Sequence, residues 1–228
     1  NRDLSLKPEA ERRLRFQREF GSYVMENILF KISFPAEFHA QTACEAAVAL
    51  HPQVKDRLAE IDKIVLTTHD SAIRIISKTG PLANPADRDH CLQYMTAVPL
   101  IFGELTADHY EDTFHAGNPL IDQLRNQMVV EEDVEYSVAY HDPEKRSIAN
   151  AVQVFFTDGS ATDKIAVEYP VGHRRRREEG IPLLVNKFER HLATRFPADR
   201  CHKIVHLCCE QAVLEALPVQ TFMDLWMI

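Results

Sequence analysis

The chain has 228 residues, of which 45% are apolar, and its 34 acidic side chains outnumber 26 lysines and arginines, giving a net charge of −8. This is enough to bury the core of one large domain, or of one domain with an appendage. No apolar run reaches the roughly 18 residues that a membrane span needs. The acidic balance also argues against a nucleic-acid binder, which would carry a basic surface.

Glycine and cysteine usage argues against three kinds of site. The 7 glycines lie too far apart for a nucleotide-binding glycine loop. The 5 cysteines include no C-x-x-C pair, which argues against a disulfide framework and an iron–sulfur cluster. His202 and His206 lie among the last three cysteines, but their spacing matches no standard closed zinc site. We therefore expect neither a metal nor another cofactor.

Residues 1–24 are predicted to form a charged lead-in. Its arginines are mixed with acidic side chains, whereas a transit peptide is poor in acids. The chain opens on Asn1 without an initiator methionine, and we expect it to be part of a longer protein. The short apolar run over 23–32 predicts a buried strand or an extended connection.

A helix and a strand are predicted next. The segment after Ser33-Phe34-Pro35 carries Ala43 and Leu50 at helical spacing, and we expect this helix to end at His51-Pro52. Residues 63–68 are rich in β-branched side chains, which favours a strand.

A second helix is predicted to begin at Asn84. Asparagine is a favoured N-cap, and Pro85 suits the first helical position. An apolar stripe continues over 91–102, within which Pro99 is expected to kink or end the helix.

The middle of the chain carries the other strand signals. Two short helices are expected around Ala107 and over 120–127. The predicted strands are 129–130, 149–157 and 165–169. Asp158-Gly159 is a hairpin signal between the last two, in a loop longer than two residues.

The composition changes after Pro170. From residue 181 onward only helices are expected, interrupted at Pro197 and Pro218. We therefore predict an α+β unit over 25–176, made of a small sheet with flanking helices, followed by an all-helical segment over 177–228.

Three clusters could carry chemistry. Lys31, Glu37 and His39 surround a predicted helix N-terminus, which favours a bound carboxylate or phosphate, and histidine can transfer a proton near neutral pH. The other clusters are 87–90 and 172–177. In the cluster over 87–90, the arginine could bind a carboxylate bidentately. The cluster over 172–177 could form an anion-binding rim.

Each cluster also has a plainer interpretation. An inward-facing histidine is more often a core residue with satisfied hydrogen bonds. The charges over 87–90 could form a surface ion network, and those over 172–177 a solvated loop.

Four stretches resemble the MmgE/PrpD family. They are GSYVMENILFK (21–31) running into FPAEFH (34–39), NPADRDHC (84–91), YHDPEKR (140–146) and EYPVGHRRR (168–176). The similarity is collinear from about residue 16 to the C-terminus, and it is strongest to fungal-type members.

The resemblance implies removal of water from 2-methylcitrate to give 2-methyl-cis-aconitate, a step of propionate breakdown, without an iron–sulfur cluster. Residues 25–176 would be a lid domain and 177–228 a tail belonging to a larger helical domain. The active site would lie between these domains, so residues 1–228 alone are expected to be inactive. The resemblance further implies a homodimer and a mitochondrial location, or otherwise a cytoplasmic one.

The resemblance also suggests roles for individual residues. Lys31 and His39 would act at the reacting centre, with His90 as another proton carrier. The carboxylates of the substrate would be bound by Arg88, His173 and Arg174. Related cis-aconitate decarboxylases place a lysine and a histidine at this junction in a slightly different register, so either His39 or Glu37 faces the substrate.

Two alternatives stay open at this point. The chain could come from another family member that acts on a tricarboxylate, by hydration or decarboxylation of aconitate. It could also be a non-catalytic module for binding or dimerisation.

Overall fold

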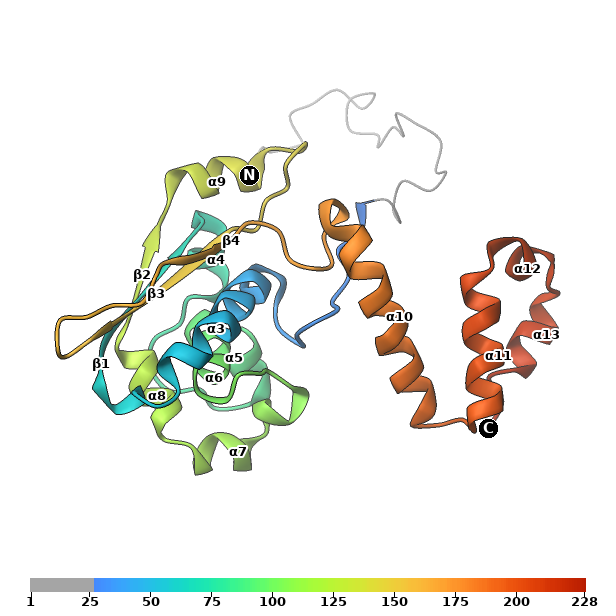
Figure 1. The fold of residues 1–228 in the computed structure, drawn as a ribbon, viewed down its shortest axis with the longest axis horizontal. Coiled ribbons are helices and arrows are strands. Elements are labelled where there is room, and N and C mark those ends of the chain that lie inside the picture. The colour runs from blue at the N-terminus through green and yellow to red at the C-terminus, as the bar shows by residue number, and fades with distance from the viewer. Residues whose placement is uncertain (1–26) are drawn as a thin grey trace, which may run out of the picture.

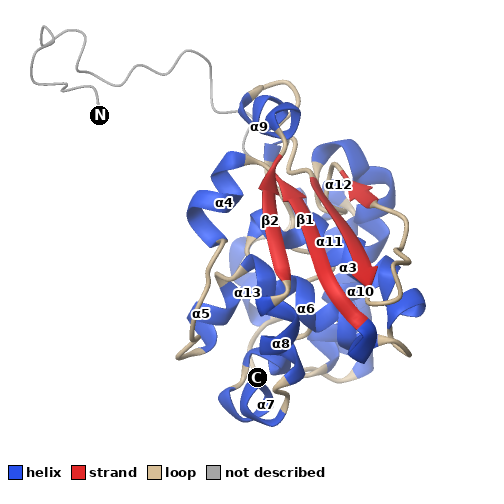
Figure 2. Cartoon of the chain, turned by 90° about the vertical axis from the view of Figure 1, so that its left-hand side faces the viewer, coloured by secondary structure: helices blue, strands red, loops and turns tan. Residues whose placement is uncertain are grey.

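The computed structural model describes residues 27–228, so the predicted lead-in over 1–24 lies outside the described residues. A four-stranded sheet is formed by β1 (Ile61–Thr68), β2 (Met128–Glu132), β3 (Asn150–Phe156) and β4 (Ile165–Val167), in the order β2-β1-β3-β4. β2 runs parallel to β1, while β3 is antiparallel to both of its neighbours (Figures 1 and 2). The α+β prediction is confirmed.

The strands follow from the side chains that the sequence supplies. β1 begins two residues before the predicted 63–68, and its isoleucine, valine and threonine side chains suit a pleated, half-buried surface. β3 and β4 form the expected hairpin, with Gly159 at a φ of 85°, where only glycine is unstrained.

Helix α3 (Gln41–Val54) covers one face of the sheet and packs against β3, β4 and α6 (Leu92–Phe102). Ala43, Ala46 and Ala47 are fully buried on it, and such small side chains let the helix approach its neighbours closely. Larger buried side chains such as Leu50 and Leu66 fill the space between the layers. In Figure 2 the sheet faces the viewer and α3 and α6 lie behind it.

One predicted helix end is wrong, and of the two effects expected of Pro99, a kink or a helix end, the structure excludes the helix end. α3 continues through His51-Pro52, and Lys55 N still donates to His51 O at 2.9 Å, so the proline removes one donor without ending the helix. Pro99 lies inside α6, which ends at Gly103 with a φ of 75°, a left-handed conformation that favours glycine.

The helix predicted from Asn84 is divided in two. α5 (Pro85–Asp89) is capped as expected, because the Asn84 side chain accepts from Asp87 N at 2.9 Å. The chain then leaves the helical conformation at His90 and Cys91 before α6 begins.

The remaining elements before residue 177 are short. They are η2 (Phe38–Ala40), η3 (Leu58–Glu60), α4 (Asp70–Ile76), η4 (Ala107–Tyr110), α7 (Asp112–Gly117), α8 (Leu120–Asn126), α9 (Val134–His141) and η5 (Arg174–Arg176). The short helices expected near residues 107 and 120–127 are confirmed as η4 and α8. Residues 28–32 form neither helix nor strand, which agrees with the extended connection rather than the strand.

The C-terminal segment is helical, as predicted. It contains α10 (Arg177–Ala193), α11 (Ala198–Cys209), α12 (Gln211–Ala216) and α13 (Val219–Asp224). Pro197 and Pro218 each immediately precede a helix. None of the helices over 27–228 has the length and apolar character needed to cross a bilayer.

Candidate functional site

A carboxylate and an imidazole are held together at the turn that precedes α3. Glu37 is the N-cap of η2, and its Oε2 accepts from His39 N at 2.8 Å. Its two oxygens also lie 2.8 and 2.9 Å from Nδ1 of His39. Burial alone would raise the pKa of Glu37, but the hydrogen bonds and charge of His39 outweigh burial and lower it.

This contact fixes the tautomer of His39. An ionised carboxylate only accepts hydrogen bonds, so Nδ1 carries the proton and Nε2 is left as an acceptor when the ring is neutral. Tyr140 Oη lies 3.0 Å from Nε2 and donates to it. Glu37, His39 and Tyr140 thus form a hydrogen-bonded chain, which we call the relay, along which a proton can pass.

A second histidine packs against the relay. His69 follows β1 as the N-cap of α4, and its Nδ1 accepts from Ala72 N at 3.3 Å. Its ring stacks on Tyr140 with centroids 4.4 Å apart and an interplanar angle of 11°. Burial lowers the pKa of His69 to about 4, and the charge of His39 adds to this effect, so His69 is neutral near pH 7. Its Nε2 therefore carries the proton, and it has no hydrogen-bond partner within the described residues.

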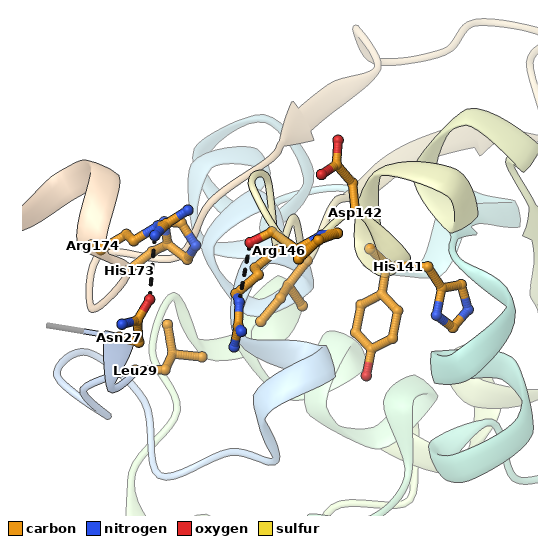
Figure 3. Close-up of a pocket in the computed structure, with 10 residues that line it drawn as sticks. Asn27, Leu29, His141, Asp142, Arg146, His173 and Arg174 are labelled. Atoms are coloured by element: carbon orange, nitrogen blue, oxygen red, sulfur yellow. Dashed lines mark hydrogen bonds between the residues drawn. The ribbon is translucent and has the colours of Figure 1, made fainter. Parts of the chain in front are cut away.

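Tyr140 also lines a cleft of about 410 Å³, within the range of small-molecule sites (Figure 3). Within residues 27–228, its ionisable lining residues are Tyr140, His141, Asp142, Arg146, His173 and Arg174. Positively charged arginines therefore outnumber the one carboxylate, which suits an anionic ligand.

Gly172 brings the two walls of the cleft together. Phe30 N donates to Gly172 O at 3.1 Å, and a Cβ at Gly172 would lie 1.7 Å from Phe30 O. Only glycine allows this approach. It places the segment with Asn27 and Leu29 beside His173, at the other end of the cleft from His141 (Figure 3).

His173 and Arg174, predicted as binding residues, both line this cleft, and their binding role stays a prediction. Burial, together with the charges of the neighbouring Arg174 and Arg175, lowers the pKa of His173 to about 4, so His173 offers hydrogen bonds and no charge near pH 7. Arg174 donates to Asn27 Oδ1 at 3.2 Å and to Glu144 O at 2.5 Å.

Lys31 lies in a different hollow from His173 and Arg174. Its Nζ is 5.0 Å from the ring centroid of Phe38, and its backbone oxygen accepts from Lys187 Nζ at 2.6 Å. With Asp89 and Tyr110 these lysines line an open groove of about 510 Å³. The predicted candidates are thus divided between the relay, the cleft and this groove.

Arg88 is only 2% exposed, and its guanidinium is engaged inside the protein. Nε donates to Tyr110 O at 2.7 Å, and a terminal nitrogen pairs with Asp112. These contacts favour an ion network over a substrate contact, although the network is more buried than the sequence indicated. His90 is half exposed, and its one ion pair among the described residues is with Asp89, at 3.4 Å. Catalytic and binding roles for both residues stay predictions.

Sequence reasoning did not single out His69 and Tyr140. Tyr140 begins one of the four stretches that resemble the family, and His69 directly follows a predicted strand, but neither signal pairs them with His39. Within residues 27–228 there is no group of three or more His, Cys, Asp or Glu side chains that could hold a metal ion.

Residues 34–211 match the model of the MmgE/PrpD C-terminal domain. The chain is 52% identical over 229 residues to a 2-methylcitrate dehydratase of Escherichia coli (strain K12), covering 99% of this chain and 47% of that protein. A 2-methylcitrate dehydratase of Cupriavidus necator is 55% identical over 217 residues, covering 94% and 45%. A "2-methylcitrate dehydratase, mitochondrial" of Yarrowia lipolytica is 52% identical over 215 residues, covering 93% and 41%. The chain spans about half the length of these relatives.

Proposed function

Since this chain belongs to the MmgE/PrpD family, we propose that the whole protein is a hydro-lyase that removes water from 2-methylcitrate to give 2-methyl-cis-aconitate. Relatives that are 52% to 55% identical to the chain carry the name of this activity. The observation within the structure that carries the proposal is the relay, whose Tyr140 reaches from partly buried His39 into an arginine-lined cleft.

The reaction needs a base, an acid and fixed positive charge. A C–H bond next to a carboxylate breaks, its electron pair forms the C=C bond, and the C–O bond breaks as the hydroxyl leaves with a proton, as water. The proton is weakly acidic, so cations must stabilise the charge that develops on the adjacent carboxylate. Proton transfer by a positioned side chain contributes roughly 10²- to 10⁴-fold to such a step.

The relay can supply the base. In the neutral relay, the Tyr140 hydroxyl donates to Nε2 of His39. When Tyr140 oxygen takes a proton from the substrate, its own proton moves to Nε2, and His39 becomes an imidazolium. Glu37, held at 2.8 Å from Nδ1 and kept ionised by its lowered pKa, stabilises that cation. In this scheme His39 acts through Tyr140, and Glu37 orients His39 rather than facing the substrate.

The cleft and the groove would supply positive charge. Arg174 lines the cleft, and Lys31 lines the groove. Because Tyr140 lines the cleft and not the groove, this scheme assigns the charge on the reacting carboxylate to the cleft, and Lys31 and His90 remain candidates from the sequence alone.

Turnover by the full-length protein tests this proposal. The enzyme is incubated separately with 2-methylcitrate and citrate, and the unsaturated product is followed by its ultraviolet absorbance. We expect dehydration of 2-methylcitrate by the full-length enzyme and none by residues 1–228 alone. Dehydration of neither compound by folded full-length protein would overturn the proposal.

We also propose that the full-length protein is a homodimer and that it is mitochondrial. The relative from Yarrowia lipolytica is named as mitochondrial. The relative from Escherichia coli is equally similar, at 52% identity, and a bacterium has no mitochondria, so a cytoplasmic location is the alternative. Light scattering of the full-length protein measures the first property. Fractionation of the source cells measures the second.

A further inference from the structure

Arg146 has an unusual backbone conformation in the wall of the cleft. Its φ is 49°, and no other non-glycine residue between 27 and 228 has a positive φ. A positive φ brings the Cβ of an ordinary residue close to its own backbone and is therefore strained. Strained residues persist where the surroundings hold them, and they cluster at ligand sites.

Two hydrogen bonds hold Arg146 in this conformation. Arg146 N donates to Asp142 O at 2.8 Å, and its Nε donates to Pro143 O at 3.2 Å. The Arg146 backbone also lies close enough to the His173 imidazole to oppose the lowering of its pKa. The turn over 142–146 therefore holds Arg146 in this conformation.

The arginines around the cleft differ in how their guanidinium groups are engaged. Arg174 donates to Asn27 Oδ1 and Glu144 O, and Arg175 donates to Glu144 O at 3.0 Å. The two terminal nitrogens of Arg146 have no hydrogen-bond partner within residues 27–228, and Arg146 lines the cleft.

The Asp142 carboxylate, the one among the described residues that line the cleft, does not neutralise Arg146. An Asp142 oxygen accepts from Glu144 N at 2.8 Å, which closes the turn. Figure 3 shows the Asp142 carboxylate directed away from Arg146. A guanidinium with two unpaired terminal nitrogens matches the two oxygens of a carboxylate.

We propose that Arg146 binds one carboxylate of the substrate bidentately in the cleft beside Tyr140, and that Arg174, which donates to Glu144 O, holds the loop that presents it. This inference rests on the proposed function for the identity of the ligand, a tricarboxylate. It gives the cleft a binding residue that the sequence did not single out, and it makes Arg174 a positioning residue.

Tricarballylate, a tricarboxylate without the hydroxyl that leaves, is the probe. Its affinity for the full-length protein is measured by titration calorimetry in wild type, Arg146→Lys, Arg146→Gln and Arg146→Gly. We expect affinity to fall at least tenfold in Arg146→Gln, and less in Arg146→Lys, which keeps the charge but loses the paired donors. Lys145→Gln, an exposed neighbour with the same loss of charge, should bind as wild type does.

Arg146→Gly separates binding from folding. Glycine adopts a positive φ without strain, so this variant should keep or raise the thermal unfolding midpoint while losing affinity. A side chain with a purely structural role would give the opposite result, a lower midpoint with unchanged affinity.

The outcomes separate this inference from the proposed function. Wild-type affinity in Arg146→Gln would overturn the assignment of Arg146, whatever the activity. Arg146-dependent binding in an enzyme that does not dehydrate 2-methylcitrate would support the assignment and overturn the proposed function. A wild type that neither binds tricarballylate nor dehydrates 2-methylcitrate would overturn both.

Discussion

Residues 27–176 and residues 177–228 differ in how much core they build. The first region has one continuous core that joins β1, α3 and α6, with side chains such as Leu66, Leu50 and Met95 fully buried. The second has a small cluster of three buried residues, Leu192, Cys201 and Ile204. In Figure 1, α11, α12 and α13 stand apart from the sheet.

The difference matters for the site because the relay and the cleft belong wholly to the first region. Glu37, His39, His69, Tyr140 and Arg146 all precede residue 177. Their geometry depends on the large core, because a side chain is held in place only where its backbone is fixed by packing. The second region contributes Lys187 to the open groove and no residue to the cleft.

The largest expected effect concerns the independence of the two cores. Trp226 is the only tryptophan of the chain and packs on Phe188 and Phe196, so its fluorescence reports the second region. In urea unfolding of residues 1–228, we expect the fluorescence transition to precede that of far-ultraviolet circular dichroism. Leu66→Ala should lower the free energy of unfolding of the later, circular dichroism transition by about 2–5 kcal/mol. Ile204→Ala should shift only the earlier, fluorescence transition.

Coincident transitions that both variants shift together would contradict this comparison. They would mean that the two regions unfold as one cooperative unit.

A pH effect of intermediate size is expected from the first region. Burial lowers the pKa of both His69 and His173 from 6.5 to about 4. Between these values the unfolded chain binds protons that the folded chain does not, so stability falls as the pH falls from 6.5 toward 4. For each histidine, the free energy of unfolding should fall by about 2 kcal/mol when the pH is lowered from 7 to 5.

His69→Asn isolates one of these contributions. Asparagine can still accept from Ala72 N as an N-cap but does not titrate. Urea unfolding at pH 7 and pH 5 should show a smaller pH effect in this variant than in wild type. His206→Gln, at an exposed position of α11, is the matched control for loss of a histidine. A full wild-type pH effect in His69→Asn would remove His69 as its source.

The smallest effect is local to α5. Asn84→Ala removes the acceptor of Asp87 N, and loss of such a cap costs about 1 kcal/mol. Urea unfolding followed by circular dichroism should show this loss, while the Trp226 transition should stay in place. A shift of the fluorescence transition by the same amount would mean that the two regions are coupled.

Local signals explain which parts of the fold the sequence could predict. β-Branched runs and the hairpin glycine identify β1, β3 and β4, and the cap at Asn84 identifies the start of α5. The end of α3 was misplaced because tertiary contacts outweigh a proline near a helix terminus. His51, for example, is fixed by a hydrogen bond of 3.0 Å with Leu100 O.

The candidate site could be predicted only in part, for a different reason. Glu37 and His39 are neighbours in sequence, so their pairing is visible as a motif. His39 and Tyr140 are 101 residues apart, and no periodicity connects them. The unpaired nitrogens of Arg146 depend on contacts that its neighbours make, which a run of basic residues does not reveal.

The rate at which full-length His39→Gln dehydrates 2-methylcitrate tests the central claim most directly, with His206→Gln as the control from the second region. We expect kcat to fall by at least about 10²-fold in His39→Gln, the lower end of what a positioned proton carrier contributes, and to stay near wild type in His206→Gln. Near-normal turnover by a folded His39→Gln enzyme would contradict the account and remove the relay from the reaction.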